Sequence, residues 1–220
     1  LLRNPGSAGR LVADVWAGDE GARAAIAHPE AVAARDGSLL GNGLLEVSRI
    51  ARDGSPYRSS LLYEAATIEA AVTEYLVRSE QIVALVHLEV EVSKGVIGAS
   101  CGYLVQLTPE GTRAQLDQIL ERVERMPALA SGMTSDDPDG RAWVAQLLDG
   151  FLWDQVAREQ PHFACRCSRG RLVAALSALP REDLQELVDA GEPTESICEY
   201  CNTTYTLSVP ELQVLLAPQQ

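Results

Sequence analysis

The chain has 220 residues, of which 46% are hydrophobic and 22% charged, a composition typical of globular proteins rather than disordered or fibrous ones. Its formal net charge of −13 argues against nucleic acid as a partner, because a polyanion repels another polyanion, and the 5% aromatic content is low for a single-strand stacking surface. No apolar run reaches the roughly 18 residues of a membrane span and no export signal is visible. We therefore expect a cytoplasmic protein that does not bind membranes.

The sequence predicts a protein of α+β class in which residues 1–126 form an N-terminal α/β core body. The glycines Gly98 and Gly102 fall inside a strand pattern, which indicates a bulge or close backbone packing there. An alternating apolar stretch ends in the turn 51–56, which favours a hairpin. The expected strands are Ala8–Val15, Gly43–Ile50, Gln81–Val92 and Gly95–Gln106, and the expected helices are Ile68–Leu76 and Pro109–Met126.

Residues 127–160 predict a linker with its own helix. Small, weakly apolar residues and a solvated Asp-Pro-Asp-Gly turn come first, and Arg141–Val156 then returns to helical periodicity. This helix carries Trp143, Phe151 and Trp153, which we expect to pack on the body.

Residues 161–220 predict a small domain. Ser168 can cap a helix over Arg169–Leu179, and a second helix runs from Pro180 to Gly191, a glycine suited to the position just after a helix. Ile197–Leu207 predicts a strand, a knuckle and a strand, and Ser208 can cap a final helix.

Four of the five cysteines lie in this last segment as two tight pairs. Cys165 and Cys167 form C-x-C, Cys198 and Cys201 form C-x-x-C, and thirty residues separate the pairs. Close thiolates repel one another unless a cation lies between them, and soft sulfur ligands select Zn²⁺ or iron over Mg²⁺ or Ca²⁺. Asn202, beside Cys201, readily takes the left-handed conformation that a metal knuckle needs. The pattern therefore predicts a four-cysteine zinc site.

Three other interpretations of the cysteines stay open. The four residues could be free or disulfide-bonded without a metal, they could hold iron in a rubredoxin-like site, or the zinc could be purely structural in a zinc-ribbon-type interaction module. The single spacer in C-x-C makes a cramped chelate, and Arg166 and Arg169 add positive charge that raises thiolate character. We therefore expect thiols that are sensitive to oxidants, which is the basis of a redox-switch hypothesis.

Several segments together resemble the heat-shock protein 33 family, also called the 33 kDa chaperonin family. The residues around the two cysteine pairs, Phe163–Arg171 and Ile197–Asn202 with Tyr205, carry most of the resemblance. Further similar segments are Gly6–Asp14, Tyr75–Gln81 with its Y-x-x-x-S-E-Q pattern, and Ala99–Leu107. Cys101 stands where the family pattern has a glycine, and several dozen N-terminal residues of the family are absent from this sequence.

The resemblance implies a redox-regulated, ATP-independent holdase chaperone rather than an enzyme. In the reduced form Cys165, Cys167, Cys198 and Cys201 would bind one Zn²⁺. Oxidation would form the disulfides Cys165–Cys167 and Cys198–Cys201, release the zinc and unfold the zinc domain (161–220) and a metastable linker (127–160). The exposed apolar surface would bind unfolding client proteins, the oxidised form would be a homodimer, and the body (1–126) would contribute client binding and dimerisation.

The remaining candidates have weaker support. Cys101 with His87 is a conceivable nucleophile pair, but nothing around them in the sequence indicates activation, so we expect a buried thiol and a core histidine. His162 could be a spare metal ligand, although four cysteines already complete a tetrahedron.

Overall fold

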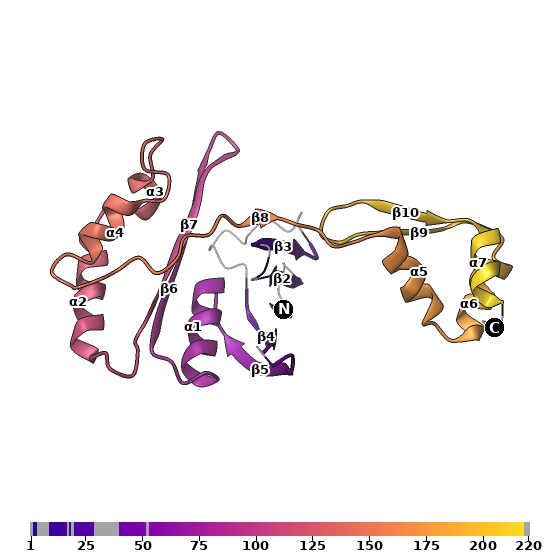
Figure 1. The fold of residues 1–220 in the computed structure, drawn as a ribbon, viewed down its shortest axis with the longest axis horizontal. Helices are drawn as coiled ribbons and strands as arrows, with labels where there is room; N and C mark the ends of the chain where they lie inside the picture. The colour runs from indigo at the N-terminus through magenta and orange to yellow at the C-terminus, as the bar shows by residue number, and fades with distance from the viewer. Residues whose placement is uncertain are drawn as a thin grey trace. The chain divides into compact units, whose positions relative to one another are not determined.

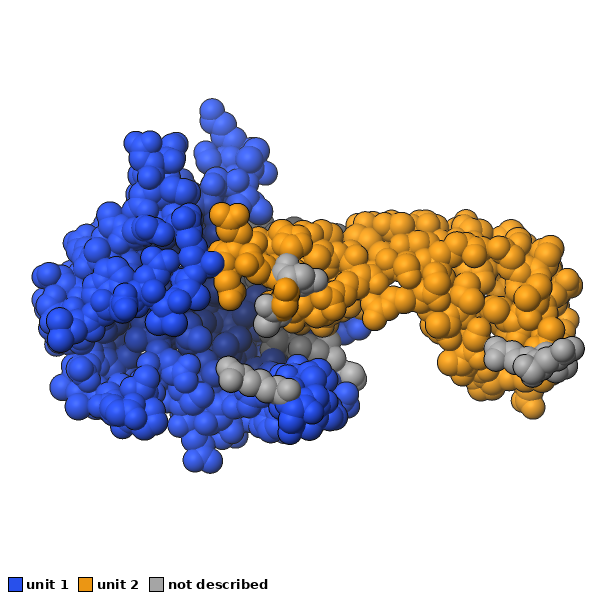
Figure 2. Space-filling model, in the orientation of Figure 1, with its two compact units in different colours: residues 1–11, 26–158 blue, residues 12–25, 159–220 orange. Residues whose placement is uncertain are grey.

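The computed structural model describes residues 2–3, 9–16, 18, 20–28, 40–51 and 53–217. It forms two compact units: unit 1 comprises residues 1–11 and 26–158, and unit 2 comprises residues 12–25 and 159–220 (Figure 2). The elements are mixed helices and strands, which confirms the predicted α+β class (Figure 1). The functional division at residues 126 and 160 stays a prediction.

Unit 1 contains a hairpin of β4 (Asn42–Ile50) and β5 (Pro56–Glu64), paired from Asn42 opposite Glu64 to Ile50 opposite Pro56. The turn is set by Asp53, whose carboxylate accepts hydrogen bonds from the backbone and hydroxyl of Ser55. This confirms the predicted hairpin. The short β1 (Leu2–Arg3) pairs antiparallel with β4.

Helix α1 (Ile68–Arg78) packs on this hairpin and completes the first core. Thr67 caps the helix by accepting a hydrogen bond from the Ala70 amide. The predicted helix is therefore confirmed, with two more residues at its end. The buried residues of this core are Leu40, Leu45, Tyr63, Ala71 and Tyr75.

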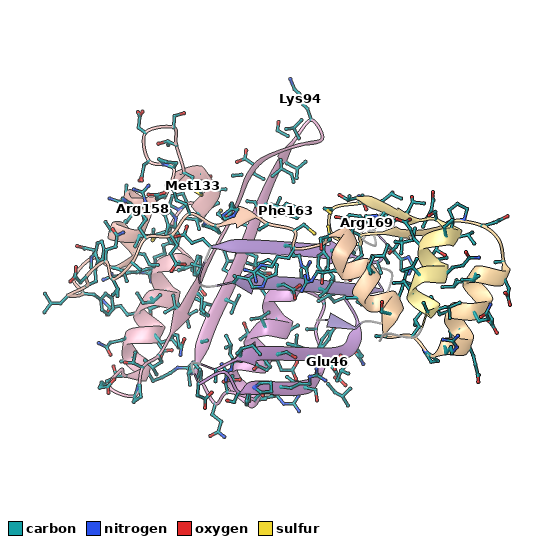
Figure 3. The ribbon with its side chains drawn as sticks, turned by 45° about the vertical axis from the view of Figure 1, so that its right-hand side comes forward. Glu46, Lys94, Met133, Arg158, Phe163 and Arg169 are labelled. Atoms are coloured by element: carbon teal, nitrogen blue, oxygen red, sulfur yellow. The ribbon has the colours of Figure 1, made fainter. Side chains whose placement is uncertain are left out.

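A second hairpin joins β6 (Ala84–Ser93) to β7 (Val96–Gln106) through Lys94 and Gly95, which both have positive φ as a type I′ turn requires (Figure 3). Both glycine predictions are confirmed. The register shifts at Glu91 so that Gly98 is the extra, unpaired residue of a bulge. A Cβ at Gly102 would lie 2.6 Å from the carbonyl oxygen of His87, so only glycine allows the strands to approach this closely.

The second core of unit 1 joins β7 to α2 (Arg113–Val123), α3 (Leu129–Gly132) and α4 (Arg141–Leu147). Trp143 is 5% exposed, and its indole N–H donates to the Pro127 carbonyl at 2.8 Å. Phe151 packs against the same core. The expectation that these aromatic side chains pack on the body is confirmed for Trp143 and Phe151 but was wrong for Trp153, which is half exposed.

The predicted helix Arg141–Val156 is too long. Helix α4 ends at Leu147, and Gly150 follows with a φ of 76°, which a helix cannot contain. The Arg122 side chain, from α2, donates to the carbonyls of Leu147 and Asp149 and so satisfies groups that the end of the helix leaves unpaired. Residues 152–161 consequently have no regular secondary structure.

Unit 2 contains most of β2 (Arg10–Trp16) and β3 (Gly21–Ile26), which are neighbours in one sheet, and the two-residue strand β8 (His162–Phe163), which pairs parallel with β3. Strand β2 agrees with the predicted strand from Arg10 onward, whereas Gly6–Ala8, named in the resemblance and the predicted strand, lie outside the described residues.

The rest of unit 2 is a small helical core beside a β-hairpin. Ser168 caps α5 (Arg169–Ser177), Gly191 with a φ of 70° follows α6 (Arg181–Asp189), and Ser208 forms a capping box at α7 (Val209–Leu216), all as predicted. The hairpin strands are β9 (Thr194–Ile197) and β10 (Thr204–Leu207). The buried core residues are Leu184, Leu207, Leu212 and Leu216.

Within the described ranges, no helix combines the length and apolar character needed to cross a lipid bilayer.

Candidate metal centre

The four clustered cysteines lie on two loops of unit 2. Cys165 and Cys167 occupy the loop between β8 and α5, and Cys198 and Cys201 occupy the turn between β9 and β10. The turn is fixed by two backbone hydrogen bonds, from Asn202 to the Cys198 carbonyl and from Cys198 to the Thr203 carbonyl. Asn202 has a φ of 56°, so the predicted left-handed conformation at the knuckle is confirmed.

The four sulfur atoms all lie within 4.8 Å of one another. Two separations run between the motifs: 3.6 Å from Cys165 Sγ to Cys198 Sγ, and 3.4 Å from Cys167 Sγ to Cys201 Sγ. A tetrahedral ion with metal–sulfur bonds of about 2.3 Å needs sulfurs about 3.8 Å apart. No pair is joined as a disulfide. The four thiols are therefore positioned to hold one metal ion, and no other group of three or more such ligands occurs among the residues that the structure describes.

Two hydroxyl groups contact the sulfurs. The Tyr205 hydroxyl lies 3.1 Å from Cys167 Sγ, and the Thr203 hydroxyl lies 3.2 Å from Cys201 Sγ. The hydrogen bonds from the side chain and backbone of Thr203 lower the pKa of Cys201 to about 6. The pKa of Cys165 is also lowered, chiefly by a hydrogen bond from the Cys167 backbone. The Cys201 thiol is thus able to ionise at neutral pH, and a thiolate is the form that binds metal.

The pKa of Cys167, by contrast, is raised. The Tyr205 hydroxyl lowers its pKa, but Cys201 and Cys165 raise it by more, and the net pKa is about 12. Four thiols at these separations cannot all be ionised at once unless a cation neutralises their negative charge. The donor set therefore fits a soft divalent cation, and such a cation would take the place of the thiol protons.

The other candidate residues from the sequence, Cys101, His87 and His162, lie outside the cysteine cluster. Burial raises the pKa of Cys101, with a further contribution from the Glu89 charge, so this thiol is a poor nucleophile. Cys101 packs against the second core but is only partly buried, so the expectation of a buried thiol is confirmed in part. His87 is 42% exposed and 3.1 Å from a Glu69 carboxylate oxygen, so the expectation of a core position was wrong although its polar group has a partner. His162 is exposed on β8 and is not in the cysteine cluster.

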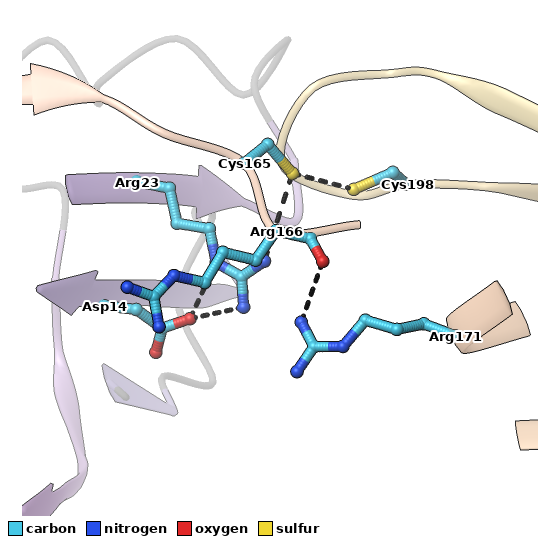
Figure 4. Close-up of polar contacts among 6 residues, drawn as sticks. All are labelled: Asp14, Arg23, Cys165, Arg166, Arg171 and Cys198. Atoms are coloured by element: carbon cyan, nitrogen blue, oxygen red, sulfur yellow. Dashed lines mark hydrogen bonds and ion pairs between the residues drawn. The ribbon is translucent and has the colours of Figure 1, made fainter. Parts of the chain in front are cut away.

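Sequence reasoning missed Arg23, which reaches the centre from β3. One of its terminal nitrogens lies 3.9 Å from Cys165 Sγ (Figure 4). The arginines that the sequence singled out have other partners: Arg166 stacks over the Trp16 ring and Arg169 pairs with Glu211. Arg23 is 142 residues from Cys165, and no motif links the two positions.

The family model described as "Hsp33 protein" matches residues 2–208. The chain belongs to the Hsp33 family. Curated relatives named "33 kDa chaperonin" from Streptococcus gordonii and Streptococcus pneumoniae are each 29% identical over 181 residues. These alignments cover 82% of this chain and 62% of each relative, so the chain spans about three fifths of their length.

The fold also agrees with a solved member of the Hsp33 family. The crystal structure of the 33 kDa chaperonin from Thermotoga maritima matches with a TM-score of 0.78 and 23% sequence identity. The match covers 98% of this chain and 75% of that one. The predicted resemblance is thus confirmed at the level of the family and the fold.

Proposed function

We propose that this chain is a redox-regulated, ATP-independent holdase chaperone of the bacterial cytoplasm, with four zinc-bound cysteines as its redox switch. The observation that carries the proposal is the group of four sulfur atoms within 4.8 Å in a chain of the Hsp33 family. Its proposed partners are unfolding client proteins, and its proposed active form is an oxidised homodimer. We propose no catalytic turnover, and neither nucleic acid nor a membrane as a partner.

In the reduced form, Cys165, Cys167, Cys198 and Cys201 would be the zinc ligands. The bound ion would supply the positive charge that lets all four thiols ionise. The ligands connect the loop before α5 with the β9–β10 turn, which are more than thirty residues apart in sequence. For so small a domain, metal binding contributes directly to the free energy of folding.

Oxidation would remove the ligands. Peroxide would take two electrons from the thiolates of Cys165 and Cys167 and two protons from the solvent, giving one disulfide and two waters, and a second peroxide would react in the same way with Cys198 and Cys201. A disulfide sulfur carries no charge and is a poor metal ligand. The connection between the two loops would then be lost, and we propose that the zinc domain (161–220) unfolds.

Residues 127–160 would then release apolar surface to clients. Trp143 and Leu147 are buried in the second core of unit 1, so unfolding of this segment would expose them. Leu152, Trp153 and Val156 follow α4 and are already exposed. An apolar surface of this kind binds the exposed side chains of unfolding proteins.

The test is suppression of aggregation of a heat-unfolded client. The reduced, zinc-loaded protein should not suppress aggregation, whereas protein treated with peroxide and freed of zinc should. Equal suppression by both samples, or by neither, would contradict the switch. It would favour the alternative, a zinc-ribbon-type interaction module in which the metal is only structural.

A further inference from the structure

Arg23 is mostly buried within unit 2, with 15% of its side chain exposed. Its Nε and one terminal nitrogen donate to Asp14 Oδ2 of β2 at 2.8 and 2.7 Å. The other terminal nitrogen points to Cys165 Sγ at 3.9 Å (Figure 4). The Asp14 carboxylate thus fixes the guanidinium in one orientation, and that orientation presents an N–H group to a sulfur of the metal centre.

Both cysteine motifs contact the β2 and β3 strands through their spacer residues. The guanidinium of Arg23 lies 3.8 Å from the centre of the Tyr200 ring, and Tyr200 is a spacer of the C-x-x-C motif. The guanidinium of Arg166, the spacer of C-x-C, lies 4.1 Å from the centre of the Trp16 ring. Cation–π contacts of this geometry are attractive, so the spacer residues help to align the two motifs with these strands beside the contact of Arg23 with Cys165.

The chain enters the metal centre directly from β8. The amides of His162 and Ala164 donate to the carbonyls of Glu20 and Ala22 at 3.0 and 2.9 Å, which pairs β8 with β3. His162 and Phe163 are both exposed, so burial of their side chains adds little to this pairing. A two-residue strand is marginal by itself, and it therefore depends on the contacts that hold Cys165, two residues beyond its end.

We propose that Arg23 is a positioning residue of the four-cysteine centre that makes the pairing of β8 with β3 depend on the oxidation state of Cys165. A thiolate is a strong acceptor for the guanidinium because the two groups carry opposite charges, whereas the neutral sulfur of a disulfide is a much weaker acceptor. Oxidation of Cys165 therefore weakens the contact with Arg23 and frees β8 from β3. This inference refines the proposed function and rests on it, because the effect of oxidation on β8 has a biological role only if the four-cysteine centre is a redox switch.

The test is amide hydrogen exchange, followed by NMR on the reduced, zinc-loaded chain. Arg23→Gln should speed exchange at His162 and Ala164 by about tenfold or more, the factor that loss of a charge-assisted hydrogen bond gives. Asp14→Asn keeps the arginine but loosens its orientation, so it should give a smaller increase. In the oxidised protein, exchange at these amides should be fast, and Arg23→Gln should change it no further.

Arg169→Gln is the matched control, because it removes the same charge and one ion pair to a carboxylate within the same unit. It should leave exchange at His162 and Ala164 unchanged. The amide of Leu212, in α7, reports whether the core of unit 2 remains folded in each variant. If Arg23→Gln unfolds that core, the Asp14→Asn variant is used to test the inference instead. Faster exchange at His162 and Ala164 in that variant, with the Leu212 amide still protected, supports the inference.

Three results would overturn the inference: exchange in Arg23→Gln equal to wild type, an equal increase in Arg169→Gln, or unchanged protection in the oxidised wild type. No client is present in this experiment. A protein that fails the aggregation assay can still show the expected hydrogen-exchange pattern, so failure of the proposed function and failure of this inference are distinguishable.

Discussion

Cys198 is the residue at which the proposed ligand assignment can be tested most directly. Its sulfur lies 3.6 Å from Cys165 Sγ, and the two residues come from different loops. A serine hydroxyl at this position ionises far less readily than a thiol and is a poor ligand for a soft metal. Loss of a residue that only hydrogen-bonds to a ligand already reduces metal affinity by about 10- to 100-fold, so loss of a ligand should cost more.

We therefore expect Cys198→Ser to lower zinc affinity by more than about a hundredfold in a competition titration with a chromogenic chelator. Cys101→Ser is the matched control, because Cys101 is also a partly buried thiol but lies outside the cluster. It should bind zinc as the wild type does. Full zinc affinity in Cys198→Ser would show that the ligand assignment is wrong.

Gly102 and Gly98 offer a second comparison between single residues. A Cβ at Gly102 would lie 2.6 Å from the His87 carbonyl oxygen, whereas the nearest atom to a Cβ at Gly98 is 3.8 Å away. Overpacking against a backbone atom typically costs about 1–3 kcal/mol. Gly102→Ala should lower the free energy of unfolding by this amount in urea titrations, and Gly98→Ala should change it by less than about 0.5 kcal/mol. Equal effects would mean that the strands can shift to make room.

At the scale of elements, the aromatic residues of α4 and of the segment after it differ in burial. Trp143 is 5% exposed and its ring centre is 5.5 Å from that of Tyr103 on β7, whereas Trp153 is 50% exposed. Helix α4 has seven residues, too few to be stable in isolation, so its packing must stabilise it. Trp143 is the largest side chain in that packing.

Trp143→Ala should therefore destabilise unit 1 by about 3–5 kcal/mol, the usual cost of truncating a buried tryptophan. Trp153→Ala, the matched control, should cost less than about 1 kcal/mol. Urea unfolding followed by circular dichroism would measure both. Under the proposed function, Trp143→Ala should also suppress client aggregation partially while reduced, because its linker is already loosened. Similar stabilities of the two variants would contradict this role of Trp143.

The elements also show where sequence reasoning works. Ser168, Gly191 and Asn202 were interpreted correctly because their effects are local: a side chain caps the adjacent helix, or a backbone angle suits its own residue. The end of α4 was misplaced although a local signal was present: Gly150, with a φ of 76°, stops the helix, and the Arg122 side chain then satisfies the Leu147 carbonyl.

Arg23 was missed because its contact with the cysteine cluster is long-range. It lies 142 residues from Cys165, and the contact exists only after folding. The cysteines themselves were found because their spacing within each motif is short and chemically specific, and the structure brings the two motifs together. Local sequence therefore predicted the cysteine cluster, whereas the residues around it depend on long-range packing.

At the scale of the whole molecule, the hydrophobic cores and the metal centre are distributed unequally between the units. Among the described residues, unit 1 has two cores, one around Tyr63 and one around Trp143. Unit 2 contains a smaller core of four buried leucines, with all four clustered cysteines. A small core contributes limited stability, so the metal should supply a large share of it in unit 2 and almost none in unit 1.

Removal of the metal should therefore unfold the units unequally. Binding of an ion to the folded state alone stabilises that state by mass action, and a strong chelator reverses the effect. In the reduced protein, the chelator should raise hydrogen exchange across β9, β10 and the β8 amides while β4 and β5 keep their protection. Excess zinc should restore the original pattern. Equal loss in both units would mean that the metal stabilises the whole chain, and no loss in unit 2 would mean that its leucine core is sufficient, which would remove the physical basis of an oxidation-driven switch.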